Sequence, residues 1–235
     1  MCKGRALTIM HVGAISTESA VRGAQAAHKY GCDAISCVPP FFFRPSLRSL
    51  LDHYKAVADA SDGLPFFVYN LPQLTNVETV PAMMEQIVRH VPSVTGLKHS
   101  ALNFADIRAF TDMGLKCFSG SGYLPLPALA MGAVGTVDAP LSLAPWVYVD
   151  LYNAWQEGDI PRAKARQEEV RKYVDLVIMF QAASHVCKVV LGERLGIDCG
   201  EPIPPVNRLS DDEKQEVLKA AKTAGVLRAP APARR

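Results

Sequence analysis

The stretch LPFFVYNLP, residues 64–72, carries the pattern that decides the fold. It begins as a short apolar run, and the polar pair Tyr69 and Asn70 follows before Pro72. Similar runs recur along the chain, and each is mostly apolar instead of alternating, which is typical of strands buried on both faces of a parallel sheet. We therefore expect six strands, at residues 7–12, 34–38, 65–69, 94–97, 115–118 and 133–137.

Segments with helical periodicity separate these strands. Ser16 or Thr17 can cap the first helix, and Pro45 suits the first turn of the second. Asn103 can cap a helix over residues 104–113. Strand and helix thus alternate every 20–30 residues or so, as in consecutive right-handed βαβ units. Beyond residue 140 the pattern predicts helices only, at residues 142–157, 160–183, 184–195 and 210–224.

These elements predict an α/β protein with three parts. Residues 1–141 form a partial β/α barrel, residues 142–228 form C-terminal helices packed on that barrel, and residues 229–235 form a frayed tail with Ala-Pro repeats. The 235 residues suffice for one α/β domain, whereas a closed eight-stranded barrel usually needs about 250. We therefore expect a TIM-barrel type fold that is incomplete at its N-terminus and has about six β/α units.

Composition excludes several classes of protein. With 49% hydrophobic residues and a net charge of +2, the chain has neither the composition of a disordered protein nor the basic surplus of a nucleic-acid binder. Its apolar runs are too short for a membrane span, and we expect no secretory signal at the N-terminus. These features favour a cytoplasmic protein with no nucleic-acid or membrane partner.

The cysteines and histidines show no metal-binding spacing. The six cysteines are scattered without a C-x-x-C pair, so we expect reduced thiols, with zinc ligation as the alternative. His53 and His90 fall in helical segments, where exposure to solvent is the simplest expectation. The sequence therefore predicts no metal site.

Polar residues that follow the apolar runs are the candidates for chemistry, because ligands of parallel α/β proteins bind beyond the carboxyl ends of the strands. Lys98 follows Val94–Leu97 at such an end. Burial disfavours the charged ammonium, so a fraction of such a lysine is a neutral amine that can attack a ketone and form a Schiff base. The alternative is a lysine that reaches solvent or pairs with a carboxylate.

Tyr69 is the second candidate. It ends the preceding apolar run, and a phenol on a neighbouring strand could exchange a proton with the Lys98 amine during imine formation. Taken alone, it could equally be a core tyrosine whose hydroxyl finds any partner. The presence of both residues at successive strand ends favours the catalytic interpretation.

The motif Y-N-x-P at residues 69–72 and the later G-x-K at residues 96–98 resemble the family of N-acetylneuraminate lyase and dihydrodipicolinate synthase. These are pyruvate-dependent class I aldolases on a (β/α)8 barrel, and the lyase branch is the more similar one. The resemblance implies a carbon–carbon lyase or aldolase that joins pyruvate to an aldehyde, or cleaves the 2-oxo acid product, with no metal or organic cofactor. It also implies a homo-oligomer, commonly a tetramer.

The same resemblance assigns roles to individual residues. Lys98 is the expected Schiff-base lysine and Tyr69 the expected proton-relay tyrosine. Ser100, Gly120 and Thr136 match positions that lie near the substrate.

Several departures from the family pattern narrow this expectation. The family's carboxylate-binding loop, with its Gly-x-x-Gly-Glu pattern, has no counterpart, and the first two β/α units are missing. The remaining departures are replacements of family tyrosines by Phe41 and Phe42 or Phe43, of a threonine by Pro39, of acidic residues by Gly122 and Tyr123, and of the synthase arginine by Gln73 and Leu74. These changes disfavour both a nine-carbon sugar acid and the dihydrodipicolinate branch.

Two other interpretations stay open. The chain could be a catalytically silent or truncated relative that acts as a structural or regulatory subunit, since a partial barrel leaves sheet edges that invite pairing. Alternatively, the recorded start is wrong and the protein begins further upstream, which would restore the carboxylate loop.

Overall fold

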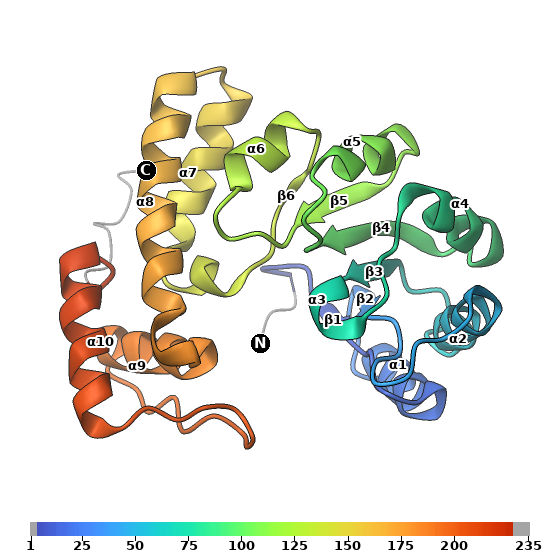
Figure 1. The fold of residues 1–235 in the computed structure, drawn as a ribbon, viewed down its shortest axis with the longest axis horizontal. Coiled ribbons are helices and arrows are strands. Elements are labelled where there is room, and N and C mark those ends of the chain that lie inside the picture. The colour runs from blue at the N-terminus through green and yellow to red at the C-terminus, as the bar shows by residue number, and fades with distance from the viewer. Residues whose placement is uncertain (1–3, 228–235) are drawn as a thin grey trace. The chain divides into compact units, whose positions relative to one another are not determined.

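The computed structural model describes residues 4–227, and its centre is a six-stranded sheet whose strands follow chain order (Figure 1). Strands β1 to β5 pair in parallel with their neighbours. The strands are β1 (Ile9–His11), β2 (Ala34–Cys37), β3 (Phe66–Asn70), β4 (Val94–His99), β5 (Lys116–Ser119) and β6 (Gly135–Thr136). All six overlap the predicted runs, so the parallel α/β architecture is confirmed.

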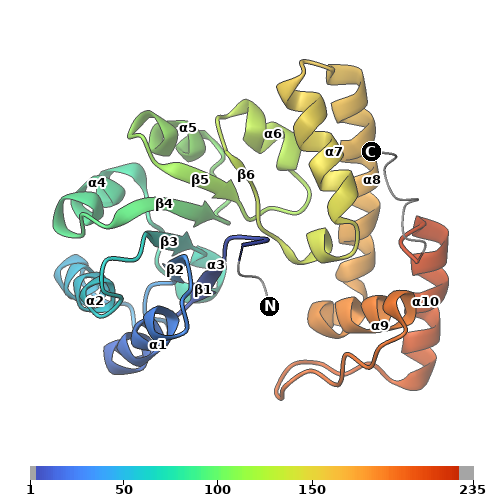
Figure 2. The same cartoon turned by 180° about the vertical axis from the view of Figure 1, so that it is seen from behind.

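Helices connect the strands, and those at residues 17–29, 47–59, 81–90 and 105–112 lie along one side of the sheet in both ribbon views (Figures 1 and 2). They bury one face each, as Ala20, Ala24 and Ala27 of the first helix illustrate. The connecting helices are α1 (Thr17–Lys29), α2 (Leu47–Asp59), α3 (Pro72–Thr75), α4 (Pro81–His90), α5 (Ala105–Asp112) and α6 (Pro125–Ala130). Strands β2 and β3 are buried along most of their length.

The helix starts test the predicted caps. Ser16 caps α1 as expected, because its side chain accepts a hydrogen bond from the Ser19 N–H. The expectation for Pro45 was wrong, since Ser46 is the N-cap of α2 and Pro45 precedes it. The Asn103 cap was also wrong, because that side chain donates to Asp106 Oδ1 at 2.8 Å instead of accepting from the backbone.

The C-terminal part of the described chain is helical, as predicted. It consists of the 3-10 turn η1 (Ala139–Ser142), α7 (Pro145–Gln156), α8 (Ile160–Val177), the turn η2 (Met179–Gln181), α9 (Ala183–Leu195) and α10 (Asp211–Ala224). Helix α8 ends earlier than expected because Phe180 has a φ of 55°, which breaks the helical backbone. Helix α10 begins with a capping box formed by Ser210 and Glu213, which the sequence analysis did not predict.

The described residues form two compact units. One comprises residues 4–120 with 130–135, and the other comprises residues 121–129 with 136–227. The division into residues 1–141 and 142–228 stays a prediction, and the expected tail, residues 229–235, lies outside the described residues.

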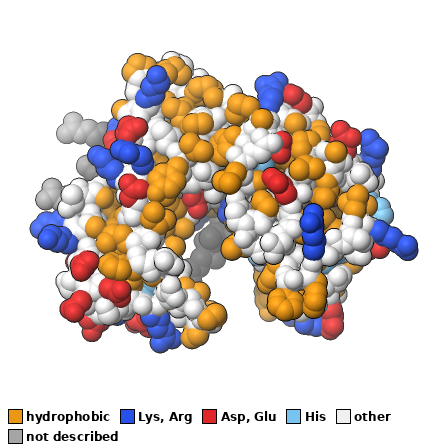
Figure 3. Space-filling model, viewed as in Figure 1, with side chains coloured by type: hydrophobic (Ala, Val, Ile, Leu, Met, Phe, Trp, Pro, Cys, Tyr) orange, Lys and Arg blue, Asp and Glu red, His pale blue; other side chains and the backbone are white. Residues whose placement is uncertain are grey.

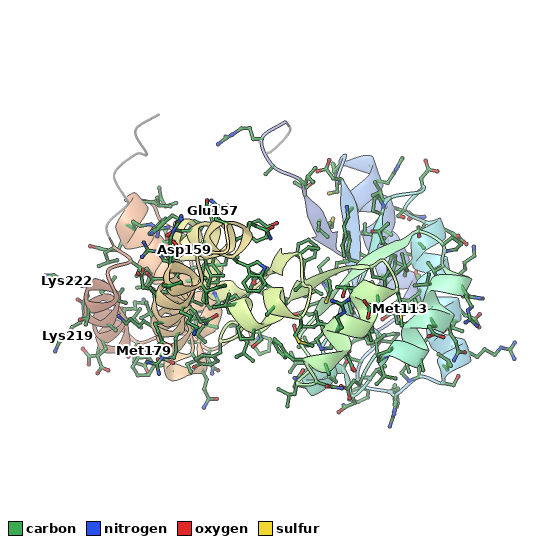
Figure 4. The ribbon with its side chains drawn as sticks, turned by 90° about the horizontal axis from the view of Figure 1, so that it is seen from above. Met113, Glu157, Asp159, Met179, Lys219 and Lys222 are labelled. Carbon is green, nitrogen blue, oxygen red and sulfur yellow. The ribbon has the colours of Figure 1, made fainter. Side chains whose placement is uncertain are left out.

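In the second unit, helices α7 and α8 lie side by side in both ribbon views (Figure 2). Asp150 of α7 binds Arg162 and Arg166 of α8, and these guanidinium groups lower the pKa of its carboxyl. Figure 4 shows Glu157 and Asp159 at the turn between the two helices, where Asp159 accepts a hydrogen bond from the Arg162 N–H at 3.1 Å. The apolar sides of α7 and α8 join those of α9 and α10 in one core.

Both units expose some apolar side chains to solvent on the face seen in Figure 3. Between residues 4 and 227, no helix is long and apolar enough to cross a membrane.

His53 corrects the expectation of an exposed helical histidine. Its side chain is buried between α1 and β2, where Nδ1 lies 2.9 Å from Thr17 Oγ1 and Nε2 lies 3.6 Å from the Cys37 sulfur. Burial lowers the pKa of His53 to about 4 and raises the pKa of Cys37 to about 12. Both groups are therefore neutral near pH 7, so this buried thiol and imidazole form no reactive ion pair.

Acid should destabilise the first unit through His53. As the pH falls below about 6.5, the unfolded chain binds a proton at this residue, whereas the folded chain does so only near pH 4. The stability that the neutral ring contributes is present above pH 6.5 and is lost as the pH falls towards 4, by about 3 kcal/mol in all. Urea unfolding across this range should show that loss in the wild-type chain and a clearly smaller one in His53→Gln.

The matched control is His90→Gln, which changes an exposed histidine of α4. It should leave the pH dependence of unfolding as it is in the wild-type chain. An unchanged pH dependence in His53→Gln would contradict the buried neutral state of His53.

Candidate active site

Strands β3 and β4 bring the two predicted catalytic residues together in the first unit. Tyr69 and Lys98 are register partners in the parallel pair, so their side chains leave the sheet side by side on the same face. Lys98 Nζ donates a hydrogen bond to Tyr69 Oη at 2.8 Å and lies 4.2 Å from the centre of the tyrosine ring. Both residues are half-buried, and the phenol holds the amine through this hydrogen bond.

The glycine of the G-x-K motif has a packing reason. A Cβ on Gly96 would lie 2.2 Å from the Lys116 carbonyl oxygen of β5 and 2.7 Å from the ring of Phe67. No side chain fits at those distances. Gly96 therefore allows β4 to approach both neighbours, and this close packing holds the strand that carries Lys98.

Ser100 and Gly120 lie beside Lys98. The Gly120 N–H donates to the His99 carbonyl at 2.9 Å, which brings the end of β5 against the end of β4. A Cβ on Gly120 would lie 1.9 Å from Ser100 Oγ and 2.8 Å from Lys98 Cε. The absence of a side chain there thus leaves the space that the serine hydroxyl and the lysine stem occupy.

Thr136, the remaining predicted site residue, ends β6 and belongs to the second unit. Its proposed contact with substrate stays a prediction.

Asn70 organises the opposite face of the same strand ends, a role that the sequence analysis missed. Its Oδ1 accepts from the Thr79 N–H at 2.9 Å, and its Nδ2 donates to the Thr79 carbonyl at 3.0 Å. Nδ2 also lies 3.2 Å from His99 Nδ1, while His99 Nε2 lies 3.1 Å from the Asn103 carbonyl. Burial lowers the pKa of His99, and a neutral ring that donates from Nε2 to the carbonyl and accepts at Nδ1 satisfies both contacts.

This buried network directly adjoins Tyr69 and Lys98 in sequence. Asn70 follows Tyr69, and His99 follows Lys98. Because successive side chains of a strand point to opposite faces, Tyr69 and Lys98 on one face are each followed by an anchored residue on the other. The asparagine of Y-N-x-P was the available signal for this role.

The aromatic residues after β2 lie in a loop. Phe42 and Phe43 are 80% and 77% exposed, and their rings contact each other edge to face at 4.8 Å. Gln73, which replaces the synthase arginine, donates from Nε2 to the Ser100 carbonyl at 3.0 Å and so holds the backbone that follows β4. Its amide therefore contributes to the position of Ser100.

Across the described part of the chain, no three His, Cys, Asp or Glu side chains lie close enough together to hold a metal ion. The cysteines at positions 32, 37, 117, 187 and 199 are free thiols, and Cys2 lies outside the described residues.

The fold and this cluster define a class of protein: a parallel β/α protein with a lysine and a tyrosine paired at successive strand ends. The model of the dihydrodipicolinate synthetase family matches residues 1–224. The chain belongs to that family, which confirms the resemblance seen in its motifs.

Individual relatives agree with this assignment. An N-acetylneuraminate lyase from Citrobacter koseri is 36% identical over 180 residues, an alignment that covers 75% of this chain and 60% of that protein. The chain therefore spans less than two thirds of that relative's length.

Solved structures show the shared fold. The Ruminococcus gnavus sialic acid aldolase matches with a TM-score of 0.90 at 24% identity, covering 96% of this chain and 76% of its own. A prophage protein of the dihydrodipicolinic acid synthase family from E. coli K12, solved in complex with pyruvate, matches with a TM-score of 0.88 at 20% identity, covering 96% and 77%. The likeness confirms the barrel-type fold, with six strands in the described residues.

Replacing Asn70 should destabilise the first unit. In Asn70→Ala, the buried backbone groups of Thr79 and the His99 ring lose their partner, and we expect a loss of about 2–4 kcal/mol in the free energy of unfolding. Urea unfolding monitored by circular dichroism measures it.

Asn153→Ala is the matched control, because Asn153 is an exposed residue of α7. That change should alter the unfolding free energy by less than about 0.5 kcal/mol. Equal effects of the two substitutions would refute the anchoring role of Asn70.

Proposed function

We propose that this chain is a Schiff-base-forming carbon–carbon lyase or aldolase, similar to N-acetylneuraminate lyase, with pyruvate as one partner. The observation that carries the proposal is the 2.8 Å hydrogen bond from Lys98 Nζ to Tyr69 Oη at the strand ends. The lyase and aldolase names of the relatives, and the pyruvate complex of the E. coli protein, support the choice of substrate class.

In the proposed reaction, the neutral amine of Lys98 attacks C2 of pyruvate and forms a carbinolamine. Tyr69 is placed to give a proton to the departing hydroxyl, which leaves as water and gives the iminium ion. Loss of a proton from the pyruvate methyl group then gives an enamine, whose carbon attacks an aldehyde, and hydrolysis releases the 2-oxo acid. Cleavage follows the reverse course.

This chemistry needs no metal or organic cofactor, because the iminium nitrogen itself accepts the electron pair of the breaking bond. Ser100, Gly120 and Thr136 are the proposed substrate-binding residues. Gly120 leaves space beside the amine, and Ser100 offers a hydroxyl next to it.

The aldehyde partner is proposed to be shorter or more apolar than that of a nine-carbon sugar acid. Gly122 and Tyr123 replace acidic residues of the lyase branch, and the Tyr123 hydroxyl is already engaged, donating to Asp175 Oδ1 at 2.8 Å. A cytoplasmic homo-oligomer, tetrameric by resemblance, completes the proposal.

A silent structural subunit is the alternative from the sequence. The intact pair of Lys98 and Tyr69 favours the lyase, because a subunit without chemistry has no need of an amine hydrogen-bonded to a phenol.

Trapping with pyruvate and borohydride should label Lys98. Reduction of the imine adds one stable pyruvate-derived group, which intact-mass measurement detects and peptide mapping locates. Lys98→Ala should take up no such label, whereas Lys116→Ala, which removes an exposed lysine of the neighbouring strand, should label as the wild-type chain does. A wild-type chain that stays unlabelled, or that labels elsewhere, would disprove the proposal.

Two further substitutions test the geometry. Tyr69→Phe keeps the ring but loses the hydroxyl, and it should slow adduct formation by ~100-fold. Gly120→Ala should slow it by a similar factor, because the new Cβ displaces Ser100 Oγ and Lys98 Cε. Gly135→Ala is the control, since a Cβ there meets only ordinary contacts of 3.5 Å with Phe118. Its adduct rate should stay within about 3-fold of wild type, and a comparable loss in both glycine variants would argue against a specific role for Gly120.

A further inference from the structure

His11 is the last residue of β1 and shares a face of the sheet with the reactive pair. In the parallel registers, His11 pairs with Ser36 and Ser36 pairs with Phe67. Register partners present their side chains to the same face, and Phe67 lies two residues before Tyr69 on that face. The topology thus brings a histidine from a strand distant in sequence to the side of the sheet that carries Lys98.

The His11 ring contacts the ring of Tyr69. The two centroids lie 5.8 Å apart with an interplanar angle of 88°, an edge-to-face arrangement that aromatic pairs prefer. Gly13 leaves room for the imidazole, since a Cβ on it would lie 2.9 Å from His11 Nε2. The imidazole thus lies against the phenol ring, in space that the missing side chain of Gly13 leaves open.

The charge of His11 suits this neighbourhood. Desolvation by surrounding atoms and, to a lesser degree, the Lys98 ammonium lower the pKa of the imidazole. The ring is therefore neutral near pH 7 and adds no like charge beside the lysine, whereas an arginine or lysine at this position would repel it.

We propose that His11 is a positioning residue, whose ring holds the plane of the Tyr69 phenol so that its hydroxyl stays in hydrogen-bonding range of the Lys98 amine. The inference rests on the function proposed above. It extends that function by a residue from outside the two motifs, acting on the phenol and not on the substrate.

His11 is exposed, so it can be replaced without unfolding the chain. The side chains of all three β1 residues are exposed, so a change at His11 removes little buried apolar surface. Met10 is the matched control, because it adjoins His11 on the same short strand, points to the other face and is 37% exposed.

The experiment measures adduct formation with pyruvate and borohydride in three variants, each checked for folding by its thermal midpoint. We expect His11→Ala to lower the maximal rate of adduct formation by about 5- to 10-fold. The half-saturating pyruvate concentration should change by less than about 2-fold, because the contact positions Tyr69 for imine formation and does not bind pyruvate. The rate of His11→Phe, which keeps an aromatic ring, should stay within about 3-fold of the wild-type rate. The control Met10→Ala should react at the wild-type rate.

Other results would contradict either the positioning role of His11 or the proposed function. A wild-type rate in His11→Ala, a loss confined to pyruvate affinity, or His11→Phe as slow as His11→Ala would each overturn the positioning role. A wild-type chain that forms no adduct at Lys98 would instead overturn the proposed function on which the inference rests.

Discussion

The register between β3 and β4 is the constraint on which the candidate site depends. It pairs Tyr69 with Lys98, and the resulting hydrogen bond is possible because parallel strands present register partners to the same face. A slip of one strand by one residue would turn its member of the pair to the helix-covered face and bring the following residue, Asn70 or His99, to the interior. The chemistry proposed for this chain is therefore a consequence of strand pairing.

What holds that register lies largely on the opposite face. Asn70 satisfies both backbone groups of Thr79 and approaches His99, so a slip would leave several buried polar groups without partners. Such groups cost free energy to bury unpaired, which makes the slipped arrangement unfavourable. Gly96 adds a steric condition, because no residue with a Cβ fits between β5 and the Phe67 ring. Polar pairing and close packing together specify one register.

Sequence patterns predicted the strands and the position of Tyr69 and Lys98 at neighbouring strand ends, and they predicted helix starts and side-chain environments less well. The short apolar runs that end at Tyr69 and Lys98 predict a strand, its burial and the polar residue at its end. The local sequence therefore suffices to predict these features. His53 could not be placed this way, because its burial depends on Cys37 and Thr17 from other elements. The Asn103 cap failed for a similar reason, since Asp106 competes for that side chain and nothing in the pattern ranks the two arrangements.

The residues that hold Tyr69 and Lys98 in place were hard to predict for the same reason, because their contacts are tertiary. The Y-N-x-P motif contains Asn70, but its spacing does not give the contacts of Asn70 or of His11, because each acts through a partner brought close by the fold, Thr79 for Asn70 and Tyr69 for His11. A motif can be recognised in the sequence, whereas the contacts that hold its residues in place depend on the tertiary arrangement. In this chain, the reactive pair lies on strands, which restrict motion more than loops do. The precision required of the amine and the phenol therefore comes from backbone pairing and from the side chains on either face of it.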